Sequence, residues 1–143
     1  MGKFNEVFQV YNDIGKLNLP TVLRDMREKL KLLGTEDGVL SFKLEFIMEE
    51  LLTNSFFHTV HCDVPINIYY CVRLDKFSID YQESGAENLD FAKLLANGRL
   101  LANNPSLDKV GGLGLHLISE LAKQFDYEYN TLTKTRMFKM ILS

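Results

Sequence analysis

Apolar and polar residues follow one another along the chain with two spacings, one typical of strands and one typical of helices. Alternating segments that are rich in β-branched or aromatic residues predict strands. Segments in which apolar residues recur every three or four positions predict helices. The predicted strands are residues 6–12, 64–74, 76–83, 126–132 and 135–142, and the predicted helices are residues 19–34, 39–60, 88–96 and 113–125.

The order of these elements is β-α-α-β-β-α-α-β-β, and it predicts the fold class. Strands that follow one another in pairs form hairpins, and the helices are expected to pack on one face of a mixed, mostly antiparallel sheet. This is an α/β two-layer sandwich. Residues 97–112 combine weak periodicity with many turn-forming residues, so we expect a loop that can move. Without repeats or low-complexity linkers, residues 1–143 are predicted to form a single domain.

Composition narrows the class of protein. A chain of 143 residues is long enough to bury a core, and its net charge of −3 argues against a general nucleic-acid binder. No apolar run approaches the roughly 20 residues that span a bilayer, and the N-terminus has no apolar signal core. Two cysteines give no disulfide framework. We therefore expect a cytoplasmic protein without direct nucleic-acid or membrane contacts.

A stripe of polar residues lies within an apolar helix face. Glu50, Asn54 and His58 follow one another at intervals of four in the long predicted helix. Steps of four advance by about 40° around a helix, so the three side chains form one slanted line, with Leu51 beside it. Buried polar groups cost free energy unless they are satisfied, so the stripe indicates a polar partner. Glu49, on the other side of the helical wheel, is predicted to be solvated.

Glycines gather where the helix 113–125 begins. The segment GGLGL comprises Gly111, Gly112, Leu113, Gly114 and Leu115. Glycine lets the backbone approach a ligand closely, and the first turn of a helix offers unpaired N–H groups to an anion such as phosphate. A flexible turn before a core helix explains the same glycines, and the motif alone does not decide between the two.

The third informative segment is Glu83-Ser84-Gly85, at the end of a predicted strand. An acidic residue there is a plausible floor for a nucleotide base. A carboxylate only accepts hydrogen bonds, so it favours the exocyclic amino group of adenine over the carbonyl of guanine. Acidic residues followed by glycine also mark ordinary turns.

In this order, the three segments resemble the anti-sigma-factor serine kinases, a branch of the histidine-kinase-like (GHKL) ATPases. The N box of that family, Glu-x-x-x-Asn-x-x-x-His, is matched by Glu50, Asn54 and His58, and its glycine-rich G2 box by residues 111–115. Thr135 corresponds to a threonine that often faces the phosphates in this superfamily. The resemblance covers nearly the whole chain, and it implies a Bergerat-type ATPase fold that binds ATP and Mg²⁺.

The resemblance also implies a role for each matched residue. Asn54 would supply a carbonyl oxygen to Mg²⁺, which prefers oxygen ligands. Glu50 would take the proton of an attacking hydroxyl, or order that hydroxyl. The backbone amides of residues 111–115 would hold the phosphates. Arg99 and Lys109 are candidates to cover the charge that develops during transfer.

The chain departs from the family pattern at the base. The family's G1 box carries Asp-x-Gly, and its aspartate binds adenine, whereas this chain has Glu83 before Ser84 and Gly85. Glutamate extends the carboxylate by about 1.5 Å, while a hydrogen bond tolerates a few tenths of an ångström. The pocket is reshaped, a water is displaced, or nucleotide binding is weak. Asp80 is a poor substitute, since strand alternation places it on the opposite face from Glu83.

Two other roles are compatible with the residues at the end of the polar stripe. His58, His61 and Cys62 resemble zinc ligands, but there is no second cluster to complete a tetrahedral site. His58 is also compatible with an imidazole bonded to backbone rather than to a ligand.

The resemblance implies a small ATP-binding regulator. It would phosphorylate a Ser or Thr of an anti-sigma antagonist (STAS-type) protein, and alternate between that antagonist and a sigma factor or another client. ATP, ADP and a movable loop between residues 98 and 110 would give the two partners different surfaces. A homodimer is also compatible with the family.

Two rival functions share this fold. A non-catalytic binding module with weakened or lost nucleotide binding is favoured by Glu83 and opposed by Glu50 and Asn54. The ATP-binding domain of a sensor histidine kinase ranks third, because the sequence leaves no room for a phosphoacceptor helical hairpin before the first strand.

Overall fold

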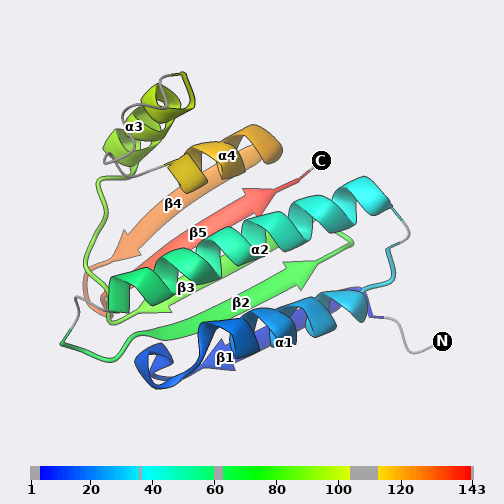
Figure 1. The fold of residues 1–143 in the computed structure, drawn as a ribbon, viewed down its shortest axis with the longest axis horizontal. Coiled ribbons are helices and arrows are strands. Elements are labelled where there is room, and N and C mark those ends of the chain that lie inside the picture. The colour runs from blue at the N-terminus through cyan, green and yellow to red at the C-terminus, as the bar shows by residue number, and fades with distance from the viewer. Residues whose placement is uncertain (1–3, 36, 60–62, 104–112, 143) are drawn as a thin grey trace.

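The computed structural model describes residues 4–35, 37–59, 63–103 and 113–142, which form a sheet covered by helices (Figure 1). The sheet has five strands in the order β1-β2-β3-β5-β4, and every neighbouring pair is antiparallel. The predicted two-layer α/β architecture is confirmed. The strands are β1 (Glu6–Tyr11), β2 (Asn67–Arg73), β3 (Ser78–Ser84), β4 (Gln124–Asn130) and β5 (Thr135–Ile141). The helices are α1 (Leu19–Lys31), α2 (Gly38–Thr59), α3 (Phe91–Asn103) and α4 (Leu113–Leu121), with a short 3₁₀ helix η1 (Ile14–Lys16).

The helices are unequally placed over the sheet. Figure 1 shows α1, α2 and α4 across one face, whereas α3 lies beyond β4 and packs on α4. Local signals in the sequence start two of these helices. The Asn18 side chain accepts a hydrogen bond from the Thr21 amide at the start of α1, and the Asp37 side chain does the same for Val39 and Leu40 at the start of α2.

The core lies between α2 and the middle strands. Ile47, Met48 and Leu52 of α2 are fully buried, as are Ile79 and Tyr81 of β3. Full burial of one such apolar side chain contributes about 1.5–3 kcal/mol. One polar pair inside this core is satisfied, because the Ser55 hydroxyl bonds both the Leu51 carbonyl (3.0 Å) and the Tyr81 hydroxyl (2.6 Å).

The region between β3 and β4 differs from the prediction. The short helix expected at 88–96 is α3, which runs from Phe91 to Asn103 and takes up part of the predicted loop. It starts late because the Asp90 side chain accepts a hydrogen bond from the Lys93 amide (3.2 Å), and it continues because Gly98 and Leu101 are buried. Packing thus overrides the turn-like composition of this segment. The remainder of the predicted loop, residues 104–112, lies outside the described residues.

The helix predicted to run to residue 125 is also shorter. α4 ends at Leu121 and β4 begins at Gln124. Phe125 pairs with Met140 of β5 and makes an edge-to-face contact with Phe91, at 5.0 Å between ring centroids. These sheet contacts explain why the last residues of the predicted helix are a strand.

Gly85 makes the sharp turn that ends β3. Its φ is +88°, and a Cβ added there would lie 2.5 Å from the Pro65 carbonyl oxygen. Its amide donates to the Lys134 carbonyl (2.9 Å). Neither the backbone angle nor the space tolerates a side chain, so this glycine is required by the fold itself.

We predict that Gly85→Ala lowers the free energy of unfolding by about 2–3 kcal/mol, because strain and overlap with backbone add together. The measurement is chemical denaturation followed by circular dichroism. Gly38→Ala is the matched control, since no atom lies within 4 Å of its added Cβ. Equal stability of the two variants would contradict the prediction.

Candidate functional site

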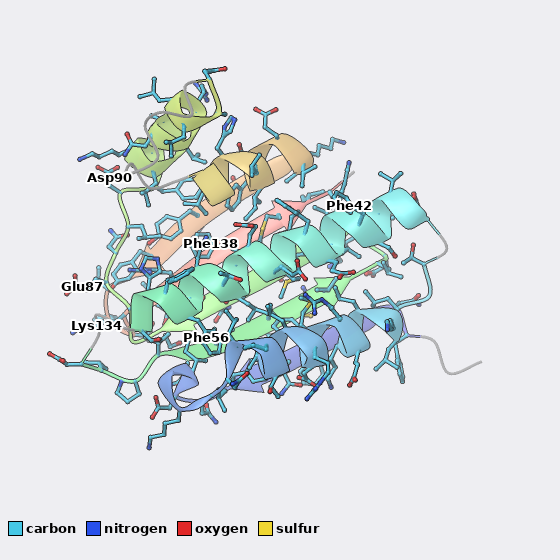
Figure 2. The ribbon with its side chains drawn as sticks, viewed as in Figure 1. Phe42, Phe56, Glu87, Asp90, Lys134 and Phe138 are labelled. Atoms are coloured by element: carbon cyan, nitrogen blue, oxygen red, sulfur yellow. The ribbon has the colours of Figure 1, made fainter. Side chains whose placement is uncertain are left out.

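A cavity of about 210 Å³ opens between α2, α4, the sheet and the segment that leads into α3. Its polar lining comes from Asn54, His58 and Glu83. Leu115 and Phe138 are among its apolar walls, and Figure 2 labels Phe138 on β5. The cavity therefore brings together residues from all three informative segments of the sequence.

The stripe on α2 meets the first turn of α4. A Cβ added to Gly114 would lie 2.6 Å from Glu50 Oε2 and 3.5 Å from Asn54 Nδ2. Any larger residue at Gly114 would therefore displace the Glu50 carboxylate or the helix. The two motifs are far apart in the sequence, yet the carboxylate and amide of one lie directly against the backbone of the other.

The Glu50 carboxyl lies in a half-buried position next to a second acid. Burial raises the pKa of Glu50 above its ordinary value of 4.5, and the neighbouring Glu49 raises it further. The helical wheel predicted a solvated Glu49, but the side chain has a protein partner. It accepts a hydrogen bond from Arg27 Nε (2.9 Å), and Arg27 also pairs with Glu45 at 3.2 Å. Arg27 on α1 thus gives Glu49 a counter-charge.

Glu83 forms the floor of the cavity together with a cation behind it. Glu83 of β3 pairs in register with Arg136 of β5, and both side chains point to the helix-covered face. Only 4% of Glu83 and 6% of Arg136 are exposed, and the closest approach of Arg136 Nη1 to Glu83 Oε1 is 3.8 Å. Neither Glu83 Oε2 nor Arg136 Nη1 has a hydrogen-bond partner. Burial raises the pKa of Glu83, and the Arg136 guanidinium opposes that rise.

Asp80 lies on the opposite face of the sheet, as strand alternation predicted. Its carboxylate accepts a 2.6 Å bond from Arg73, and Arg73 also lies 3.8 Å from Glu6. Asp80 therefore has its own partners and does not reach the cavity.

The segment between Gly85 and Asp90 is fastened to β4 and β5. In Figure 2, Glu87 and Lys134 lie at the end of the molecule where α2 ends. Arg136 Nε donates to the Glu87 carbonyl, and the Tyr129 hydroxyl donates to the Ala86 carbonyl (2.7 Å). The Tyr127 hydroxyl accepts from the Leu89 amide (3.1 Å). These bonds hold Leu89 in the wall of the cavity.

The other predicted site residues have varied positions. Gly114 and Leu115 line the cavity, whereas Gly85 shapes the turn beside it. Thr135 pairs with Ser84, so it lies on the sheet face away from Glu83, and its hydroxyl bonds Ser84 and Thr133. Its predicted contact with phosphates stays a prediction. Leu113 is the first residue of α4.

Several predictions fall on residues that the structure does not describe. Lys109, Gly111 and Gly112 lie outside the described residues, as do His61 and Cys62 of the possible zinc site. Within the described ranges, no group of three His, Cys, Asp or Glu side chains is arranged to hold a metal ion. Arg99 is an exposed residue of α3 rather than part of a loop.

The chain was compared with models of known protein families. The family model described as the histidine kinase-like ATPase domain matches residues 17–139, which is most of the chain. The chain belongs to the histidine kinase-like ATPase domain family. A search of curated proteins found no match. The helices among the described residues are each too short or too polar to cross a membrane.

Domains of the histidine kinase-like ATPase family bind ATP, and the residues at the cavity fit this ligand. Glu83 offers an unpartnered buried acceptor for a base amino group. At the other end, Gly114 lies in the first turn of α4, and the N-terminal turn of a helix is a site type that binds phosphate. Asn54 would hold Mg²⁺ through its carbonyl oxygen, a ligand type that this ion prefers. At about 210 Å³ the cavity is smaller than the roughly 300 Å³ that encloses a whole drug-sized ligand, so it suits the base end of the nucleotide.

We predict that Gly114→Ala weakens ATP binding at least about tenfold, which corresponds to about 1.4 kcal/mol, because the added methyl group displaces the Glu50 carboxylate beside Asn54. The free energy of unfolding should change by less than about 1 kcal/mol, since alanine favours a helix. Calorimetric titration and denaturation measure the two effects separately. Unaltered ATP affinity would show that the close approach of α4 to α2 has no part in binding.

We also predict that Glu50→Gln raises the free energy of unfolding at neutral pH. The folded protein binds the Glu50 proton more tightly than the unfolded chain does. The contribution of Glu50 to the free energy of unfolding therefore falls as pH rises from about 4.5 through the folded-state pKa. The gain from glutamine should therefore vanish toward about pH 4. Thermal unfolding across this range measures it, with Glu128→Gln on exposed β4 as control. A stability gain from Glu50→Gln that is largest at acidic pH would contradict the prediction, because it would mean that folding lowers the pKa of Glu50.

Proposed function

We propose that this domain is an ATP-dependent serine/threonine protein kinase of the anti-sigma-factor type. Its substrate would be a hydroxyl of a small STAS-type antagonist protein, and it would exchange that antagonist for a sigma factor or a similar client. Membership of the histidine kinase-like ATPase family supports ATP binding. The observation that carries the kinase proposal is the position of the Glu50 carboxylate against the first turn of α4.

Glu50 has the properties of a general base at this position. It lies one helical turn from Asn54, the proposed ligand of Mg²⁺, and burial raises its pKa toward the pH at which it operates. A carboxyl group whose pKa is raised binds a proton more tightly once it has accepted it. Glu50 would accept the proton of the attacking Ser or Thr hydroxyl, while Asn54 and the amides of α4 orient the nucleotide. Bound Mg²⁺ would neutralise part of the phosphate charge.

A non-catalytic binding module is the second candidate, and one observation favours it. Glu83 stands where the family carries a shorter aspartate, and it is only 4% exposed beside Arg136 in a cavity of modest size. A domain of this kind would bind its partner through surface contacts, with nucleotide affinity reduced or lost. Calorimetric titration with Mg-ATP distinguishes the two functions, since absence of heat at millimolar nucleotide favours the binding module.

We predict that Glu50→Gln abolishes phosphate transfer, by at least about 100-fold, while ATP affinity changes less than about threefold. Glutamine keeps the shape of the side chain but cannot accept the proton. Incubation with labelled ATP and a STAS-type antagonist measures transfer, and calorimetry measures binding.

The control is Glu49→Gln, which alters the adjacent carboxylate bonded to Arg27. That variant should retain most of the transfer activity. Transfer by Glu50→Gln at the rate of the unmodified protein would remove Glu50 from the role of base.

A further inference from the structure

The pair formed by Glu83 and Arg136 has an unusual arrangement for a buried ion pair. The two charged groups approach to 3.8 Å, which is within ion-pair distance but beyond a hydrogen bond. Arg136 uses Nε to bond the Glu87 carbonyl, and its Nη1 has no partner. Glu83 Oε2 also has none, although Glu83 lines the cavity. The carboxylate therefore lies close to its counter-charge with Oε2 unpartnered, and its interaction with Ser55 also favours the ionised form.

The guanidinium constrains the charge of Glu83. Arginine does not give up its proton in proteins, and the only carboxylate within 4 Å of Arg136 among the described residues is Glu83. A neutral Glu83 would leave a buried cation without a counter-charge, which is strongly unfavourable. Arg136 consequently favours the ionised form of Glu83, even though burial opposes it.

The charge of Glu83 decides what the cavity can recognise. An ionised carboxylate only accepts hydrogen bonds, so it fits the amino group of adenine and repels the carbonyl oxygen of guanine at the same place. A protonated carboxyl group both donates and accepts, so it fits either base. Discrimination between the bases therefore requires that Glu83 keep its charge inside an apolar environment.

We propose that Arg136 is a positioning residue for base selection: it holds Glu83 as an acceptor-only carboxylate at the floor of the cavity and so favours adenine over guanine. This inference rests on the proposed ATP-binding function and assigns a role to a residue that none of the sequence motifs includes. Arg136 acts through Glu83, since it does not itself line the cavity.

Other groups near Glu83 set the conditions of the test. Tyr81 and Tyr127 interact electrostatically with Glu83 from β3 and β4, and Ser55 faces it from α2. His58 also lines the cavity from α2, and α4 contributes Gly114 and Leu115, which do not titrate. The measurements are made between about pH 7.5 and 9.5, above the ordinary histidine pKa of about 6.5.

The experiment compares binding of non-hydrolysable ATP and GTP analogues, with Mg²⁺, by calorimetry. The unmodified protein should prefer the adenine nucleotide by about 100-fold at every pH in this range, since rejection rests on an unpaired buried polar group. Arg136→Gln retains a donor for the Glu87 carbonyl but removes the charge. Its preference should fall at least about tenfold near pH 7.5 and recover toward pH 9.5, as the buried carboxyl ionises. Arg136→Lys keeps the charge and should retain the preference.

Two further variants keep the inference falsifiable if Arg136→Gln folds poorly. Glu83→Gln should lose the preference without any pH dependence. Arg73→Gln breaks the ion pair with Asp80 on the opposite sheet face, and it should leave the preference unchanged. The ¹³C shift of the Glu83 carboxyl group reports its charge without a nucleotide: it should be that of a carboxylate in the unmodified protein and of the acid in Arg136→Gln near pH 7.5.

The outcomes separate this inference from the function on which it rests. Binding of neither nucleotide by the unmodified protein would refute the proposed function, and base selection with it. Normal ATP binding, together with an undiminished and pH-independent preference in Arg136→Gln, would overturn the role of Arg136 alone. A carboxylic acid signal for Glu83 in the unmodified protein would overturn it as well.

Discussion

The close approach of α4 to α2 at Gly114 is the constraint on which the site depends. An added Cβ there would come within 2.6 Å of Glu50 Oε2, so a larger residue requires the carboxylate or one of the helices to move. Gly114 and Asn54 both line the cavity at this approach, and Glu50 beside them is half-buried. A wider separation would return Glu50 to water, where its pKa would be ordinary and its position undefined.

Buried polar groups differ in whether they have hydrogen-bond partners, and this depends on where they lie relative to the cavity. Ser55 and Tyr81 lie inside the core and satisfy each other and the Leu51 carbonyl. Three buried side-chain atoms of the described residues have no hydrogen-bond partner, and two of them belong to Glu83 and Arg136. An unsatisfied buried group costs about 1–3 kcal/mol. Glu83 lines the cavity and Arg136 lies behind it, so a bound ligand would supply the missing partner to Glu83.

Local periodicity was enough to predict nearly all elements, because strand alternation and helical spacing are properties of neighbouring residues. The four-residue stripe and the glycines before α4 indicated the site for the same reason. Arg136 could not be found this way: its relation to Glu83 exists only once β3 and β5 pair in register. The bond of Glu49 to Arg27 and the full length of α3 likewise arise from packing between elements distant in sequence.

One end of the cavity is formed by the sheet and the other by helices. We therefore expect the two ends to have different roles. The end that we propose for the base is held by the sheet, through Glu83, Arg136 and the hydroxyls of Tyr127 and Tyr129. The other end is held by the contact between α2 and α4, and α3 packs on α4 rather than on α2. Because cross-strand pairing is rigid while two helices slide more readily, a change of nucleotide would be felt mainly at the α4 end. Under the proposed function, base selection would then stay constant while α4, and α3 with it, presents a different surface.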